Sequence, residues 1–151
     1  MGMSDEKPKP RSLSASEIDE LLAAQRFGVV ATVKKDGTPH LATMLHTWDP
    51  VGRVARISTT ATRAKPGHVR RHPRASLHVA EPDHMTFAVV EGLGEVSEVS
   101  TTPGDAAGLE LLAMAGEVPD RDAFLVEMVA EHRLVLRIKA ERVTGTTLHH
   151  E

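Results

Sequence analysis

A β-hairpin is predicted by residues 27–48, which read FGVVATVKKDGTPHLATMLHTW. The first half, Phe27–Val33, is rich in β-branched residues, which pack well on a pleated sheet. Asp36-Gly37 then provides a residue pair that is favoured in tight hairpin turns. The return strand is predicted to run from about His40 to Trp48. An antiparallel sheet therefore begins in the first third of the chain.

Short strands and a few helices are predicted along the rest of the chain. Further strands are predicted at Val54–Thr59, Ser76–Ala80, Thr86–Val99 and Leu134–Glu141, and helices after the capping box Ser14–Glu17, at Ala64–His72, after Asp105 and at Asp120–His132. Gly92 and Gly94 predict a bend or bulge within the longest strand. About six mostly antiparallel strands with few helices indicate a mainly β fold, a small β-barrel with peripheral helices.

The composition is that of a globular protein. The chain has 151 residues, of which 40% are hydrophobic. We expect residues 1–12 to be a disordered tail and residues 13–148 to form one domain. No apolar run is long enough to span a membrane, and the N-terminus lacks the apolar segment of a secretory signal, so we expect a cytoplasmic protein. The absence of cysteine excludes disulfides and thiolate catalysis.

A basic run interrupts a chain whose formal charge is -3. The run extends from Arg53 to Arg74 without an acidic residue, and its seven cations are Arg53, Arg56, Arg63, Lys65, Arg70, Arg71 and Arg74. The hydroxyls of Ser58, Thr59 and Thr60 lie inside it. Hydroxyls, a guanidinium and an ammonium together suit a phosphate group. The alternative is a solvated loop followed by the basic face of a helix.

Nucleic acid and metal ions are less favoured ligands for this run. The net charge is negative, and the aromatic residues are only three Phe and one Trp, whereas single-stranded nucleic acids are bound by stacking on aromatic side chains. His68 and His72 have a spacing that can bind a metal, but no cysteine or adjoining glutamate completes a ligand set. We therefore predict no metal site and no nucleic-acid partner.

The ordered motifs resemble the split β-barrel flavin and deazaflavin oxidoreductases, relatives of pyridoxamine 5′-phosphate oxidase. The resemblance extends over about Ser14–Gly145. It rests on VATVKKDGTPH at 30–40, Ser58-Thr59-Thr60 with Arg63-Ala64-Lys65, VRRHPRASL at 69–77, and Val89-Val90-Glu91-Gly92. The nearer likeness is to the branch that uses the deazaflavin coenzyme F420. The C-terminus lacks the Arg-rich, Trp-containing ending of a true pyridoxamine 5′-phosphate oxidase, so that activity is not expected.

The resemblance implies a split β-barrel of the FMN-binding-protein type and a homodimer with cofactor sites at its interface. The implied reaction is hydride transfer from reduced coenzyme F420 to a small conjugated or unsaturated substrate. Two alternatives stay open on the same fold. One is an FMN-dependent oxidoreductase, and the other is a non-catalytic protein that binds a flavin or a tetrapyrrole.

The resemblance also implies which residues bind the cofactor. Ser58, Thr59, Arg63 and Lys65 correspond to the phosphate-binding part, and His68 stands where the family often has Asn. The ring system is expected along Thr43, Met44 and Leu45, and His84 and Met85 would come from the other subunit. No catalytic residue is assigned. Arg70, Arg71 and Arg74 either contact the acidic tail of coenzyme F420 or are ordinary surface charges.

Overall fold

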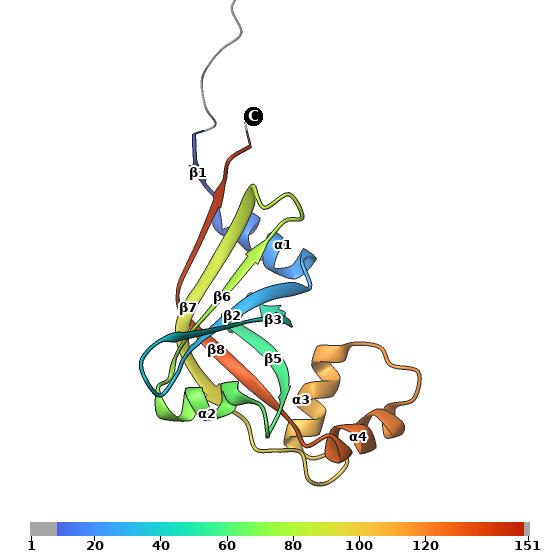
Figure 1. Cartoon of the computed structure of the whole chain (residues 1–151). Helices are drawn as coiled ribbons and strands as arrows, with labels where there is room; N and C mark the ends of the chain where they lie inside the picture. Colours follow the sequence, from blue (N-terminus) through green and yellow to red (C-terminus); the bar gives the residue numbers. More distant parts are fainter. Residues whose placement is uncertain (1–8, 150–151) are drawn as a thin grey trace, which may run out of the picture.

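One antiparallel sheet forms the body of the protein in the computed structural model, which describes residues 9–149 (Figure 1). Its strands are β1 (Arg11–Ser12), β2 (Phe27–Val33), β3 (Pro39–Leu45), β4 (Thr47–Asp49), β5 (Val54–Thr60), β6 (Arg74–Ala80), β7 (Thr86–Val96) and β8 (Arg133–Thr147). The strand order is β3-β2-β6-β7-β8-β5-β4, and β1 pairs with β8. The predicted mainly β fold is confirmed, with two very short strands in addition to the six that were predicted.

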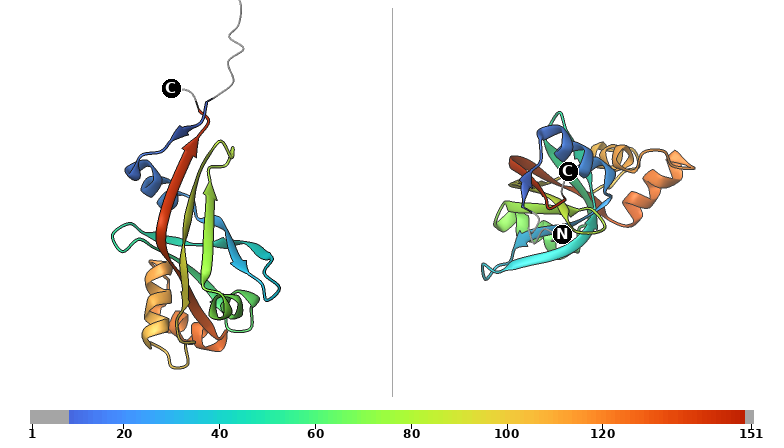
Figure 2. Two further views of the ribbon diagram at one scale, coloured as in Figure 1. Left: turned by 90° about the vertical axis from the view of Figure 1, so that its left-hand side faces the viewer. Right: turned by 90° about the horizontal axis from the view of Figure 1, so that it is seen from above.

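Within residues 9–149, four helices accompany the sheet: α1 (Ala15–Ala24), α2 (Ala64–Arg71), α3 (Ala106–Ala115) and α4 (Arg121–Ala130). The predicted capping box is present at α1, where the Ser14 hydroxyl and the Glu17 carboxylate each accept a backbone N–H. Asp105 and Asp120 cap α3 and α4 in a similar way. Helices α3 and α4 lie together in the long connection between β7 and β8 (Figures 1 and 2).

The return strand predicted over residues 40–48 is wrong in one respect, because the structure divides it at His46. The backbone N–H of His46 donates to the Arg26 carbonyl, and its Nε2 lies 3.0 Å from the Leu22 carbonyl. At this point the chain leaves β2 and continues as β4, which pairs with β5. Because β3 and β4 are consecutive in the chain but lie at opposite edges of the sheet, the sheet curls into a split barrel (Figure 2).

The predicted bulge is confirmed, because the pairing of β7 with β8 shifts between Glu91 and Gly92. A Cβ on Gly92 would lie 1.9 Å from the Lys139 carbonyl oxygen, so only glycine fits there. Beyond the bulge, β8 continues to Thr147 and pairs with Arg11–Ser12. These two residues therefore belong to the sheet rather than to the expected tail, since the end of β8 offers them a pairing edge. Residues 1–8 lie outside the described part of the chain.

The core fills the inside of the barrel, and α3 and α4 have a smaller apolar contact of their own. Fully buried core side chains include Val30, Ile57, Leu77, Val90, Leu136 and Ile138. A second cluster joins Leu111 and Met128 to Val135, with Met114 and Phe124 packed against it. The helix pair is thus attached to the outside of β8. Within residues 9–149, no helix combines the length and apolar character needed to cross a membrane.

Candidate functional site

A cleft of about 920 Å³ separates strands β3 and β4 from helices α3 and α4. Its sheet side includes Thr43, Met44, Leu45 and Ser58, and its helix side includes Leu111, Met114, Phe124 and Met128. Charged side chains line it as well: Arg26, Glu127, Glu131 and Arg133. A cleft of this size that combines apolar side chains with polar groups is typical of a site for a small molecule or a cofactor ring.

The structure brings four of the ten predicted cofactor contacts together in this cleft. They are Thr43, Met44 and Leu45 on β3, and Ser58 on β5. Thr43 and Leu45 are exposed along the edge strand, whereas Met44 is half-buried and also packs against the barrel core. Ser58 accepts a hydrogen bond from Arg133 Nη1 at 3.4 Å. The ring region that the resemblance implies therefore coincides with the wall of a cleft.

Strand alternation separates Ser58 from Thr59, although they are adjacent in sequence. Ser58 lines the cleft, whereas Thr59 is buried and only 2% exposed. The Thr59 hydroxyl has no hydrogen-bond partner in the part of the protein that the structure describes. The residues predicted to bind phosphate thus do not all face the same space within one chain.

Lys65 lies in the first turn of α2 and is only 5% exposed. No residue among 9–149 forms a hydrogen bond or an ion pair with its ammonium group. Burial, and then the positive charge of Arg63, lowers the pKa of Lys65 below its ordinary value. Because a buried cation without a counter-ion is costly, this position is suited to an anionic ligand. Arg63 is exposed at the N-cap of α2, where its side chain forms no capping hydrogen bond.

His68 holds α2 against β2 through a buried contact. Its Nδ1 lies 2.9 Å from the Thr32 hydroxyl, and its ring meets the ring of His40 edge-on at 5.1 Å. Burial lowers the pKa of His68. Nearby positive charges lower this pKa further, and they belong to His40, Arg71, Lys34 and Lys65. His68 therefore stays neutral near pH 7. The structure places this predicted cofactor contact beneath the helix, bonded to the sheet.

His84 and Met85 lie at the other end of the molecule from α2, in and beside the turn between β6 and β7 (Figure 1). His84 is exposed and has a positive φ of 63°. Near them, Glu81, Asp83 and His149 bring three possible metal ligands close together. Asp83 and His149 already pair with each other at 2.8 Å. Within one chain, His84 and Met85 do not join the cleft.

The structure divides the basic run into paired and unpaired cations. Arg53, Arg56 and Arg74 each form an ion pair with a carboxylate. Arg63, Lys65, Arg70 and Arg71, on α2 or beside it, form none with the described residues. The unpaired group contains the two cations that were predicted to bind phosphate.

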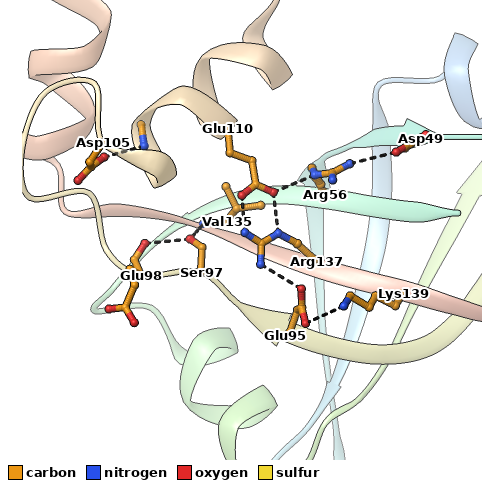
Figure 3. Close-up of polar contacts among 11 residues, drawn as sticks. Asp49, Arg56, Glu95, Ser97, Glu98, Asp105, Glu110, Val135, Arg137 and Lys139 are labelled. Atoms are coloured by element: carbon orange, nitrogen blue, oxygen red, sulfur yellow. Dashed lines mark hydrogen bonds and ion pairs between the residues drawn. The ribbon is translucent and has the colours of Figure 1, made fainter. Parts of the chain in front are cut away.

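Sequence reasoning did not identify Glu110 as the centre of an ionic network (Figure 3). Arg56 Nε donates to Glu110 at 2.9 Å, and Arg137 Nε donates to it at 2.7 Å. The hydrogen bonds from Arg137, then those from Arg56, lower the pKa of Glu110 against the effect of burial. Arg56 and Arg137 are directly opposite each other in the register of β5 and β8. Two like charges directly opposite each other on neighbouring strands are destabilising unless an acidic side chain lies between them. The two arginines were therefore the sequence signal that could have pointed to a nearby glutamate.

A curled antiparallel sheet whose edge strand flanks a cleft defines the split β-barrel class of proteins. Within that class, the chain belongs to the pyridoxamine 5′-phosphate oxidase family, whose model matches residues 14–147. The expected family is therefore confirmed.

Solved structures with this fold include a conserved hypothetical protein from Mycobacterium tuberculosis. It has 23% identity and a TM-score of 0.71, and the match covers 91% of this chain and 86% of the other. A protein named F420 reductase has 27% identity and a TM-score of 0.59, with 83% and 94% covered. A FAD-binding protein from Mesorhizobium loti has 23% identity and a TM-score of 0.63, with 91% and 96% covered.

Proposed function

We propose that this protein is an oxidoreductase that transfers a hydride from reduced coenzyme F420 to a small conjugated or unsaturated substrate. FMN is the alternative cofactor. The likeness at 27% identity to a protein named F420 reductase supports the deazaflavin. Two alternative functions would use the same site. One is an FMN-dependent oxidoreductase reaction, and the other is non-catalytic binding of a flavin or a tetrapyrrole.

The observation that carries the proposal is the cationic side chain of Lys65, a residue that is only 5% exposed. It has no counter-ion among the described residues, and the Thr59 hydroxyl is likewise buried without a partner. Both groups belong to the set that the family resemblance assigns to phosphate. A phosphate would compensate the charge of Lys65, and exposed Arg63 could add a guanidinium contact.

The cleft supplies a place for the ring. Thr43 and Leu45 would lie along one side of a flat ring system, and the apolar side chains of α3 and α4 would exclude water from the other. When bound, the reduced cofactor supplies the hydride. The residues of this chain orient ring and substrate so that the reacting atoms lie close together.

A homodimer forms part of the proposal because the outer face of β2 and β3 is apolar and exposed. Phe27 is 62% exposed, Leu41 is 64% exposed and Leu45 is 48% exposed. Phe27 and Leu45 are direct cross-strand partners, so this surface is continuous across the edge of the sheet. A second copy would cover it. It would also provide His84 and Met85, which cannot reach the cleft of their own chain.

The first experiment is a pair of fluorescence titrations, one with coenzyme F420 and one with FMN. Selective binding of coenzyme F420 is the expected result. Selective binding of FMN would replace the cofactor in the proposal, and binding of neither would overturn it. Oxidation of the bound reduced cofactor only when substrate is added would separate an enzyme from a carrier. Light scattering checks the dimer, which a monomeric mass with cofactor still bound would contradict.

A further inference from the structure

Two carboxylates lie four residues apart where α4 ends beside the cleft. Glu127 is in the last turn of α4, and Glu131 is its C-cap. Both line the cleft together with Thr43 and Leu45 of β3. Such a pair is a common arrangement for moving a proton, because neighbouring carboxylates do not ionise independently.

Arg133 forms an ion pair with only one of the two carboxylates, that of Glu131. Its Nε donates to Glu131 Oε1 at 2.9 Å, and its Nη1 donates to the Ser58 hydroxyl at 3.4 Å. Glu131 therefore has a fixed cationic partner that is itself tied to β5. Glu127 has no such partner among the residues described in the structure. The geometry thus favours an ionised Glu131 and leaves Glu127 as the member of the pair that can hold a proton.

The electrostatics of the pair agree with this geometry. The hydrogen bond with Glu131, and then its negative charge, raise the pKa of Glu127 above its ordinary value, and the positive charge of Arg133 opposes this only in part. The hydrogen bond from Arg133 is the main cause that lowers the pKa of Glu131. Two other ionisable groups line the cleft, Arg26 before β2 and His46 between β3 and β4. Burial lowers the pKa of His46, so that imidazole adds no charge near neutral pH.

From this arrangement we infer that Glu127 is the proton donor of the reduction, and that Glu131 and Arg133 are the residues that position it. The inference rests on the proposed function, because it concerns the same cleft. Glu127 is exposed. It can therefore regain a proton from solvent after each turnover.

The step is balanced as a two-electron reduction. A bound reduced deazaflavin or flavin would supply a hydride, with its electron pair, to one carbon of the substrate double bond. The π electrons move to the neighbouring carbon or to a conjugated oxygen, and that atom takes the proton of the Glu127 carboxyl group. Glu127 is left as a carboxylate, the substrate is reduced and the cofactor is oxidised.

The positions of β3 and α4 on opposite sides of the cleft have a stereochemical consequence. With the ring along Thr43 and Leu45, the hydride would arrive from the β3 side of the substrate. The proton of Glu127 would arrive from the α4 side. Hydride and proton would then add to opposite faces of the double bond, which is trans addition.

The first test needs no cofactor. The carboxyl groups are labelled with ¹³C and titrated by NMR in the wild-type protein, in Glu131→Gln and in the control Glu117→Gln. Glu117 is an exposed residue between α3 and α4. We expect Glu127 to titrate above the range of ordinary glutamates, and to return toward that range only in Glu131→Gln. Titration of Glu127 in the ordinary range in the wild-type protein would overturn the inference.

The second test measures single turnovers of the reduced, cofactor-loaded protein with 2-cyclohexenone as the probe. Glu127→Gln should bind the cofactor with wild-type affinity but react at least roughly 100-fold more slowly, the usual contribution of a positioned acid. The wild-type rate should fall as pH rises through the pKa of Glu127. In Glu131→Gln that fall should move to lower pH, whereas Glu117→Gln should keep the wild-type profile. When a deuteride-labelled cofactor is used in D₂O, the two deuterium labels in the product should be trans.

The outcomes distinguish this inference from the proposed function. A Glu127→Gln variant that binds cofactor and keeps the wild-type rate and pH profile would overturn the inference alone. Cis addition of the two labels would do the same. A wild-type protein that binds neither cofactor, or that binds one but never reduces an enone, would overturn the proposed reductase function and with it the assigned proton donor.

Discussion

Two groups of charged residues, one beneath α3 and one on α2, show opposite ways of placing cations in this protein. Beneath α3, Arg56 and Arg137 share the carboxylate of Glu110, and Arg137 continues to Glu95 (Figure 3). On α2, Lys65 is more deeply buried than either arginine, yet no described residue neutralises it.

The difference concerns what each group does. A network whose charges are satisfied by the protein itself attaches a helix to a sheet, and its loss should appear as lost stability. A buried cation without a protein partner destabilises the free protein and gains its partner from outside. We therefore expect substitutions beneath α3 to affect unfolding and substitutions on α2 to affect ligand binding.

The largest expected effect is that of Glu110→Gln. The substitution removes the carboxylate that Arg56 and Arg137 share and leaves Arg56 only Asp49 and Arg137 only Glu95, so we expect the free energy of unfolding to fall by about 3 kcal/mol, as expected for the loss of charged hydrogen bonds. Urea unfolding followed by circular dichroism measures it, with the exposed Glu117→Gln as the matched control. A loss no greater than that of the control would show that the network is not structural.

Lys65→Ala should weaken cofactor binding without lowering the free energy of unfolding. We expect cofactor affinity to weaken by about 2 kcal/mol, roughly thirtyfold, because a charged hydrogen bond is lost. The free energy of unfolding of the free protein should not fall, since no protein partner is left behind. Lys35→Ala removes an exposed cation from the β2–β3 turn and serves as the control. Wild-type affinity in Lys65→Ala would remove Lys65 from the cofactor site.

A smaller effect on the free energy of unfolding is expected from pH, and the two regions should respond in different pH ranges. The pKa of His68 is lowered from 6.5 in the folded protein, so the unfolded chain binds a proton first and stability falls as pH drops below about 6.5. The pKa of Glu110 is lowered from 4.5, so the contribution of its network is lost only below about 4.5.

The midpoint of urea unfolding should be measured from about pH 7.5 to about pH 3.5, a range that spans the ordinary pKa values of His and Glu. His68→Gln should reduce the upper part of the pH dependence, to which His46 also contributes, and leave the lower part unchanged. Glu110→Gln should reduce the lower part, to which Asp105 also contributes, and leave the upper part unchanged. If both variants kept the full wild-type curve, neither group would be responsible for it.

The smallest effect is predicted for Arg74→Gln. Arg74 pairs with Glu141 on β8, but both side chains are at least half exposed. An exposed ion pair contributes at most about 1 kcal/mol, because water already solvates both charges. Thermal unfolding should therefore be nearly unchanged. A loss comparable to that in Glu110→Gln would mean that pairing alone, and not burial, distinguishes the two regions.

Much of the local structure could be predicted because its causes lie within a few residues. Strand β2 has the predicted bounds, the Asp105 and Asp120 caps begin α3 and α4, and the bulge lies at Gly92. In each case a turn, a cap or a side-chain pattern acts over one or two turns of chain. The phosphate residues could be suggested from the same range, since hydroxyls and cations are grouped in one stretch.

The sequence by itself thus determined the elements, the family and a set of cofactor residues that awaits testing. Only the tertiary structure showed that the predicted return strand is divided at His46 and that Ser58 and Thr59 face different sides of β5. It also showed that α4 brings Glu127 to the cleft. It also showed which cations are paired, because Arg56 and Glu110 are 54 residues apart. Local preferences act between neighbours, whereas such meetings depend on how the whole sheet curls and where the helices pack against it.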